Sequence, residues 1–113
     1  MTTSRIVESL VKNKMFANEE DVMKKLLQDY IVRQIGNLKR EITRFERKYG
    51  MSFDHFKEYL HKRSELIEKG YLSSKEHQIL AQAVMQEEDD WLDWKVAKEM
   101  LESWIGLRQE TIH

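Results

Sequence analysis

The sequence predicts an all-α protein with four to five helices, and three observations lead to this prediction. Proline is absent, and only four glycines interrupt the 113 residues. Apolar residues recur every three or four positions, which is the spacing that buries one side of a helix. No segment keeps a strand-like alternation of apolar and polar residues outside such a pattern. A chain of this length is expected to form one domain over residues 1–113.

The first two helices are predicted on either side of Asn18. A short helix is expected over about residues 4–13. Asn18 can cap a long central helix over about residues 19–48, because its side chain accepts hydrogen bonds from unpaired backbone N–H groups. Three acidic residues follow Asn18 and favour the positive end of that helix.

The long helix carries an apolar seam that repeats in steps of four and three, the rhythm of a coiled coil. A helix of about 30 residues is roughly 45 Å long, which short neighbours would not cover. Helical hairpins are expected to pack on this helix, and the uncovered seam predicts a homodimer. The seam residues are Ile31, Ile35, Leu38, Ile42 and Phe45.

Two further helix starts are visible in the sequence. Gly50 suits the left-handed position that ends a helix, and Ser52 can cap the next helix, expected over about residues 53–69. Ser73 and Glu76 have the spacing of a capping box, which predicts another helix from about residue 74.

Residues 87–90 are all acidic, and two alternatives are open there. Asp89 or Asp90 can cap a new helix that begins at Trp91, or one helix can continue from 74 to 105. In either case, Gly106 is expected to end the helix and the residues after it to fray.

The charges divide the chain. Residues 1–50, which hold the long helix, carry 11 Lys and Arg against 7 Asp and Glu, a net charge of +4. Residues 51–113 carry 8 against 13, a net charge of −5. Within this half, residues 51–86 form the middle helices, and residues 87–106 form an acidic, tryptophan-rich segment.

Several classes of function find no support in the residues. Cysteine is absent, so no thiolate nucleophile or cysteine-ligated zinc is available. His61 and Glu65 stand four residues apart, but two ligands make a weak metal site. We therefore expect no catalytic, cofactor-binding or metal site, and no enzymatic activity. The longest apolar run is three residues, so no membrane span is expected and the protein is expected to be soluble and cytoplasmic.

Four arginines fall on one side of the long helix, and weak contacts to a phosphate backbone are one interpretation of them. A solvated outer face is the other interpretation, because acidic residues intervene and no aromatic residues interleave for base stacking. DNA binding is therefore only weakly supported. The arginines are Arg33, Arg40, Arg44 and Arg47.

Three tryptophans within fourteen residues are the main anomaly of the sequence. Tryptophan dominates both cores and interface hot spots, so core packing and partner binding are both open. Their apolar area exceeds what a narrow seam hides, and nearby carboxylates would steer the segment toward a basic partner. The predicted partner-binding residues are Trp91, Trp94, Leu101, Trp104, Asp90 and Asp93.

Three stretches together resemble small helical antitoxins of bacterial and archaeal type II toxin–antitoxin operons, of the kind paired with TumE-type toxins. The stretch Phe16–Tyr30 looks like the turn and second helix of ribbon-helix-helix antitoxins. The other two stretches are Phe45–Leu60 and Glu88–Ala97. Only Met1, Thr2 and Thr3 precede the first helix, where ribbon-helix-helix proteins place a DNA-reading strand, so the resemblance does not carry DNA reading with it.

The resemblance implies a non-enzymatic protein that binds a cognate toxin enzyme and blocks its active site with apolar helix faces. The toxins of such systems are often ribonucleases or nucleotidyltransferase-like enzymes. The alternative is a self-associating helical structural or adaptor protein without a toxin partner. Copurification with a second small protein would separate the two hypotheses.

Overall fold

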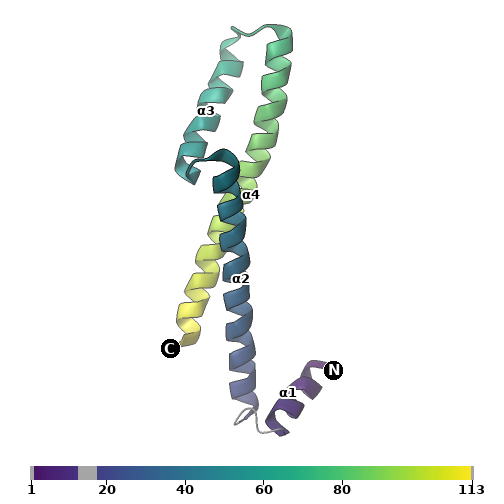
Figure 1. Cartoon of the computed structure of the whole chain (residues 1–113). Coiled ribbons are helices and arrows are strands. Elements are labelled where there is room, and N and C mark those ends of the chain that lie inside the picture. Colours follow the sequence, from purple (N-terminus) through teal and green to yellow (C-terminus); the bar gives the residue numbers. More distant parts are fainter. Residues whose placement is uncertain (1, 13–17, 113) are drawn as a thin grey trace. The chain divides into compact units, whose positions relative to one another are not determined.

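The computed structural model describes residues 2–12 and 18–112, and its regular structure there is entirely helical. The all-α prediction is therefore confirmed. Residues 13–17 lie outside the described residues, and with them the beginning of the stretch Phe16–Tyr30. The four helices are α1 (Thr2–Lys12), α2 (Glu19–Tyr49), α3 (Phe53–Lys69) and α4 (Ser74–Ile112) (Figure 1).

Three predicted helix starts, those of α2, α3 and α4, are confirmed by their hydrogen bonds. The backbone N–H of Asp21 donates to Oδ1 of Asn18 over 2.9 Å at the start of α2. Ser52 Oγ accepts from the N–H of His55 over 3.3 Å at the start of α3. The N–H of Glu76 donates to Ser73 Oγ over 3.2 Å at the start of α4. Each cap satisfies a backbone donor that has no partner inside the helix.

The turns that end α2 and α3 use glycine for its backbone conformation. Gly50 has φ 63°, and its N–H donates to the carbonyl of Glu46 over 2.7 Å. Gly70 has φ 70°. Residues that carry a side chain rarely adopt this left-handed backbone conformation, so glycine lets the chain turn sharply at both corners.

One continuous α4 crosses the acidic run, so the alternative with a new helix at Trp91 is wrong. Glu87 lies beside Arg63 of α3, with Oε2 and Nε 3.0 Å apart. Asp90 accepts a hydrogen bond of 2.6 Å from Lys48 of α2. Two of the four carboxylates therefore have cations supplied from distant parts of the chain, which reduces the repulsion along the helix.

The predicted end at Gly106 is also wrong, because α4 continues to Ile112. No atom outside its own helix lies within 4 Å of where a Gly106 Cβ would stand, so close packing does not explain this glycine. The last turn contacts α2 through a hydrogen bond in which Gln28 Nε2 donates to the carbonyl of Thr111 over 3.5 Å.

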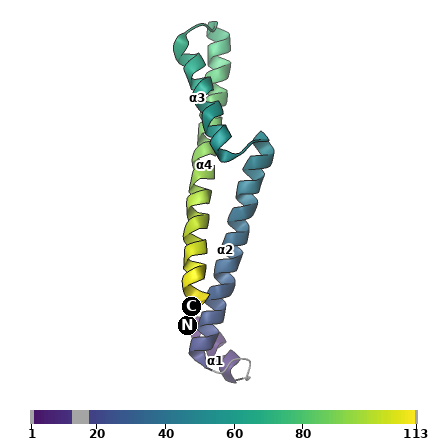
Figure 2. The same ribbon diagram turned by 90° about the vertical axis from the view of Figure 1, so that its left-hand side faces the viewer.

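The chain divides into two compact units. The terminal unit comprises residues 1–37 and 101–113, and the central unit comprises residues 38–100. Helices α2 and α4 each contribute one part to each unit. In the central unit, α3 and the first part of α4 run antiparallel, joined by the turn that follows Gly70 (Figures 1 and 2).

Aromatic side chains form the core of the central unit. Trp94 of α4 is 1% exposed, and Phe45 of α2 and Phe56 of α3 are completely buried. The ring of Trp94 stacks on Phe45 with centroids 5.7 Å apart and lies 5.6 Å from Phe56. Burial of each such side chain stabilises the fold by about 1.5–3 kcal/mol. This cluster therefore joins all three helices of the unit.

The predicted dimer seam is largely used inside the single chain. Ile31 and Phe45 are completely buried and Ile35 is 5% exposed, while Leu38 and Ile42 are partly buried. The prediction assumed short neighbours, whereas α4 is 39 residues long and contributes to both units. Three of the five seam residues are thus covered within one chain, and a dimer through this seam stays a prediction.

Candidate protein-binding surface

Helix α4 has apolar residues on two opposite sides within the central unit. Trp94 and Ala97 face the core and are 1% and 4% exposed. Met85, Leu92 and Val96 keep much larger exposed fractions of 66%, 51% and 49%. Because the neighbouring helices cover only one side of α4, its other apolar side stays on the surface.

The exposed apolar side chains form a ridge along the helix, which Glu88 and Asp89 interrupt between Met85 and Leu92. Met100 extends it, with 45% of its surface exposed. The separations along the ridge are seven, four and four residues, which keeps the four side chains within about 80° of the helix circumference. We call Met85, Leu92, Val96 and Met100 the α4 ridge.

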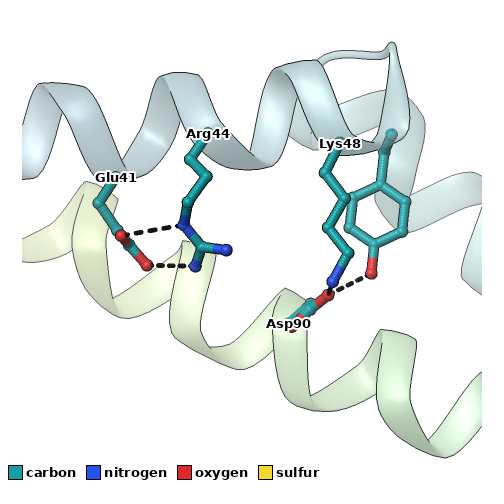
Figure 3. A network of polar contacts seen from close by, with 5 residues as sticks. Glu41, Arg44, Lys48 and Asp90 are labelled. Carbon is teal, nitrogen blue, oxygen red and sulfur yellow. Dashed lines mark hydrogen bonds and ion pairs between the residues drawn. The ribbon is translucent and has the colours of Figure 1, made fainter.

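Two carboxylates of the acidic run have partners inside the chain, and one of them closes a small polar network. Asp90 accepts hydrogen bonds from Lys48 Nζ and from the Tyr49 hydroxyl, so it links α4 to the end of α2 (Figure 3). Burial alone raises the pKa of Asp90. The hydrogen bonds from Lys48 and Tyr49 outweigh burial and leave this pKa below its ordinary value.

Tyr49 responds in the opposite direction. Burial raises the pKa of the Tyr49 hydroxyl, and its hydrogen bond to the Asp90 carboxylate raises this pKa further. The hydroxyl therefore remains a proton donor. Asp90 was predicted to contact a partner protein, but in this structure it holds α2 and α4 together.

Three other carboxylates flank the ridge. Glu88 and Asp89 lie between Met85 and Leu92, and Asp93 follows Leu92; all three carboxylates are exposed. An apolar ridge with acidic flanks fits a surface that is itself apolar and basic.

A groove lies next to the ridge, between α3 and α4. Its volume is about 770 Å³, and Leu92 and Glu88 belong both to its wall and to the ridge region. Leu60 and Trp91 supply apolar surface, and polar and charged side chains complete the lining. The lining residues are Asp54, Lys57, Glu58, Leu60, His61, Lys62, Ser64, Glu88, Trp91 and Leu92.

The predicted partner-binding tryptophans have different positions. Trp94 is a core residue whose ring is covered by phenylalanines, so the prediction that it contacts a partner is wrong. Trp91 is partly buried, stacks on Phe53 at 5.9 Å and still lines the groove. In the terminal unit, Trp104 lies with its edge against Tyr30 at 5.7 Å, and both Trp104 and Leu101 are partly buried.

Three of the four predicted phosphate-contacting arginines line one hollow on α2. Arg40, Arg44 and Arg47 surround it with Lys39 and Thr43, and its volume is about 480 Å³. The fourth, Arg33, belongs to the terminal unit.

Glu41 neutralises part of this basic face. The Arg44 guanidinium donates to both oxygens of Glu41, over 2.7 and 3.3 Å (Figure 3). These bonds lower the pKa of Glu41 and raise the pKa of Arg44. Phosphate contact by these arginines stays a prediction.

The histidine and carboxylate side chains of the described residues form pairs at most where a metal ion is concerned. No group of three or more His, Asp or Glu side chains that could hold a metal ion occurs among them. His61 Nε2 instead lies 3.0 Å from Glu65 Oε1, so the spacing that suggested a shared ligand pair produces a contact between the two.

Two further findings concern the hydrophobicity of the helices and the comparison with known proteins. No helix among residues 2–12 and 18–112 is both long enough and apolar enough to cross a membrane. Comparison of the chain with protein-family models, curated proteins and solved structures found no match.

Of the predicted partner-binding residues in this segment, Trp94 is buried in the core and Asp93 is exposed beside the ridge. Leu92 and Val96 were not among the predicted residues, because the prediction rested on the tryptophans as interface residues. Their signal was present: Leu92, Val96 and Met100 recur at four-residue steps on the side opposite Trp94.

Proposed function

We propose that the chain is a non-enzymatic, cytoplasmic protein-binding module that acts as the antitoxin of a toxin–antitoxin pair. The exposed α4 ridge with its acidic flanks is the observation that carries this proposal. Contiguous apolar surface rimmed by polar residues is typical of sites that bind other proteins.

The charges define the expected partner. Glu88, Asp89 and Asp93 have exposed side chains beside the ridge. A toxin enzyme that binds RNA or nucleotides needs a basic cleft, and these carboxylates would steer the ridge toward such a cleft. Leu92 and Val96 would then bury apolar area over the cleft and exclude its substrate.

The proposal predicts that Leu92→Ser weakens partner binding at least about 30-fold, the loss expected of a hot spot. The full chain is used to capture proteins from its native host, the captured proteins are identified, and their affinities are measured one by one. Ile79→Ser is the matched control, because Ile79 is 60% exposed on the same helix but lies about 100° around the helix from the middle of the ridge.

A growth test separates an antitoxin from a general adaptor. The captured protein should arrest growth when expressed alone, and co-expression with this chain should restore growth. The Leu92→Ser variant should fail to restore it, while Ile79→Ser succeeds. Equal behaviour of the two variants, or a captured protein that does not impair growth, would contradict the antitoxin role.

Self-association is a second candidate, and one observation favours it. The terminal unit exposes apolar side chains along α2, including Met23 and Leu27. This surface lies on α2 and the ridge lies on α4, so the two proposals rest on different residues.

A further inference from the structure

A stripe of exposed apolar side chains runs along α2 in the terminal unit. Met23, Leu26, Leu27 and Tyr30 follow the spacing i, i+3, i+4, i+7 and so share one side of the helix. Their exposed fractions are 51%, 38%, 46% and 46%, whereas Ile31 is completely buried. We call these four residues the α2 stripe.

Charges of opposite sign lie at the two ends of the stripe. Glu19 precedes Leu26 by seven residues, and Arg33 follows Leu26 by seven, so the three residues lie nearly in line along the helix. Glu19 and Arg33 are both exposed. Because Leu26 is the midpoint, this line is complementary to itself when a second copy runs in the opposite direction.

We propose that the α2 stripe binds the α2 stripe of a second copy, with the two helices antiparallel about a two-fold axis at Leu26. Each Leu26 then contacts Leu26 of the other copy, and each Glu19 faces Arg33 of the other copy. Met23 and Leu27 pack across the same axis. Such an interface is closed, so the product is a dimer and not a fibre.

The charge pattern favours the antiparallel direction, and it favours a second copy of the chain as the binding partner. A parallel pair would bring together the first turns of both helices, each with Glu19, Glu20 and Asp21. Repulsion between like charges disfavours that arrangement. The antiparallel pair opposes unlike charges on both sides of the axis, a symmetry that favours a second copy over an unrelated protein.

This interface differs from the seam that the sequence suggested, and it does not depend on the partner proposed for the α4 ridge. Four half-exposed side chains per copy bury less area than the roughly 800 Å² per partner of a standard interface. The dimer is therefore expected to be weak and to dissociate on dilution.

Sedimentation of the full chain tests the pairing, over a range from about 5 to about 500 μM that brackets a weak interface. The average mass should rise from 13.7 kDa toward twice that value. Glu19→Arg or Arg33→Glu alone should weaken dimerisation at least ~10-fold, and both changes together should restore it to within ~3-fold, because the pair is inverted but intact.

Two matched controls locate the interface. Asp21→Arg makes the same charge change in the same helical turn but on another side of α2, and it should leave dimerisation unchanged. Leu26→Ser should weaken the dimer at least ~10-fold. Val32→Ser should not, although Val32 is 49% exposed, because it lies on the opposite side of the helix.

A mass of 13.7 kDa at every concentration would overturn the proposal and assign the stripe to another occupant. Equal effects of Glu19→Arg and Asp21→Arg, or failure of the double variant to restore the dimer, would overturn it as well. If Glu19→Arg loses helical circular dichroism, the comparison of Leu26→Ser with Val32→Ser decides.

Discussion

The two units of this protein use the same residue spacing on α2 in opposite ways. In the central unit, Glu41, Arg44 and Lys48 follow the spacing i, i+3, i+7, and each has an ionic partner within the chain. In the terminal unit, residues 23, 26 and 30 have the same spacing but are apolar and exposed. In the central unit, these side chains of α2 therefore have ionic partners within the chain. In the terminal unit, the side chains at the same spacing form exposed apolar surface.

The difference shows where binding surfaces arise in a small helical protein. The central unit has an aromatic core drawn from three helices, and its polar edge is closed by Asp90 of α4. Several exposed apolar residues of that unit, among them Leu92 and Val96, lie on the outer side of α4. In the terminal unit most of the exposed apolar residues lie on α2. Each unit therefore leaves apolar side chains exposed, and the charged residues beside them differ between the two units.

The largest expected effect comes from breaking the core of the central unit. Trp94→Ala should lower the free energy of unfolding by about 3–5 kcal/mol, because it removes a buried ring and leaves a cavity. Leu92→Ala, on the exposed side of the same helix turn, should change it by less than ~0.5 kcal/mol. Chemical denaturation followed by circular dichroism measures both.

If Trp94→Ala destabilises the fold so far that its free energy of unfolding cannot be measured, Trp94→Phe serves as the milder variant. It should still lose more stability than Leu92→Ala. Similar losses at positions 92 and 94 would mean that α4 does not present Trp94 to the core.

The next effect tests the polar edge of the central unit. Asp90→Asn should lower the free energy of unfolding by about 1–2 kcal/mol at neutral pH, because it weakens hydrogen bonds from Lys48 and Tyr49 to a charged acceptor. Lys48 is 44% exposed, so solvent screens part of the attraction and keeps the loss moderate.

The pH dependence of this loss follows from the lowered pKa of Asp90. The ordinary value is 3.8, and the folded protein holds the group below it. The stabilisation is therefore fully present above pH 3.8 and is lost as the pH falls through the folded pKa. The gap between the natural chain and Asp90→Asn should stay constant from pH 7 to about pH 4 and then close. A gap that does not depend on pH would mean that the Asp90 charge contributes nothing.

The sequence was sufficient for features whose chemistry is local. Asn18, Ser52 and Ser73 cap helices with their own side chains, and Gly50 turns the chain through its own backbone, so a few neighbouring residues carry the whole signal. These features fixed where α2, α3 and α4 begin, and they were predicted correctly.

Features that depend on distant residues were not predictable in the same way. The helix across residues 87–90 continues with cations on Glu87 and Asp90, and those cations come from Arg63 and Lys48 on other helices. The side of α4 that faces the core depends on where Phe45 and Phe56 lie, which no local pattern gives. The sequence therefore did not reveal that Trp94 is buried and Leu92 is exposed.

The smallest expected effect tests whether the terminal unit really leaves the α2 stripe uncovered. Leu27→Ala should change the free energy of unfolding by less than ~0.5 kcal/mol in dilute solution, because Leu27 is 46% exposed there. Ile31→Ala, one turn further along α2, should cost about 2–4 kcal/mol, because Ile31 is completely buried. At high protein concentration the Leu27→Ala loss should grow, since dimerisation stabilises only the folded chain and the variant weakens it. Thermal denaturation at several concentrations measures this growth. A Leu27→Ala loss that is large even in dilute solution would show that the stripe is already covered within one chain, and the contrast between the two units would then fail.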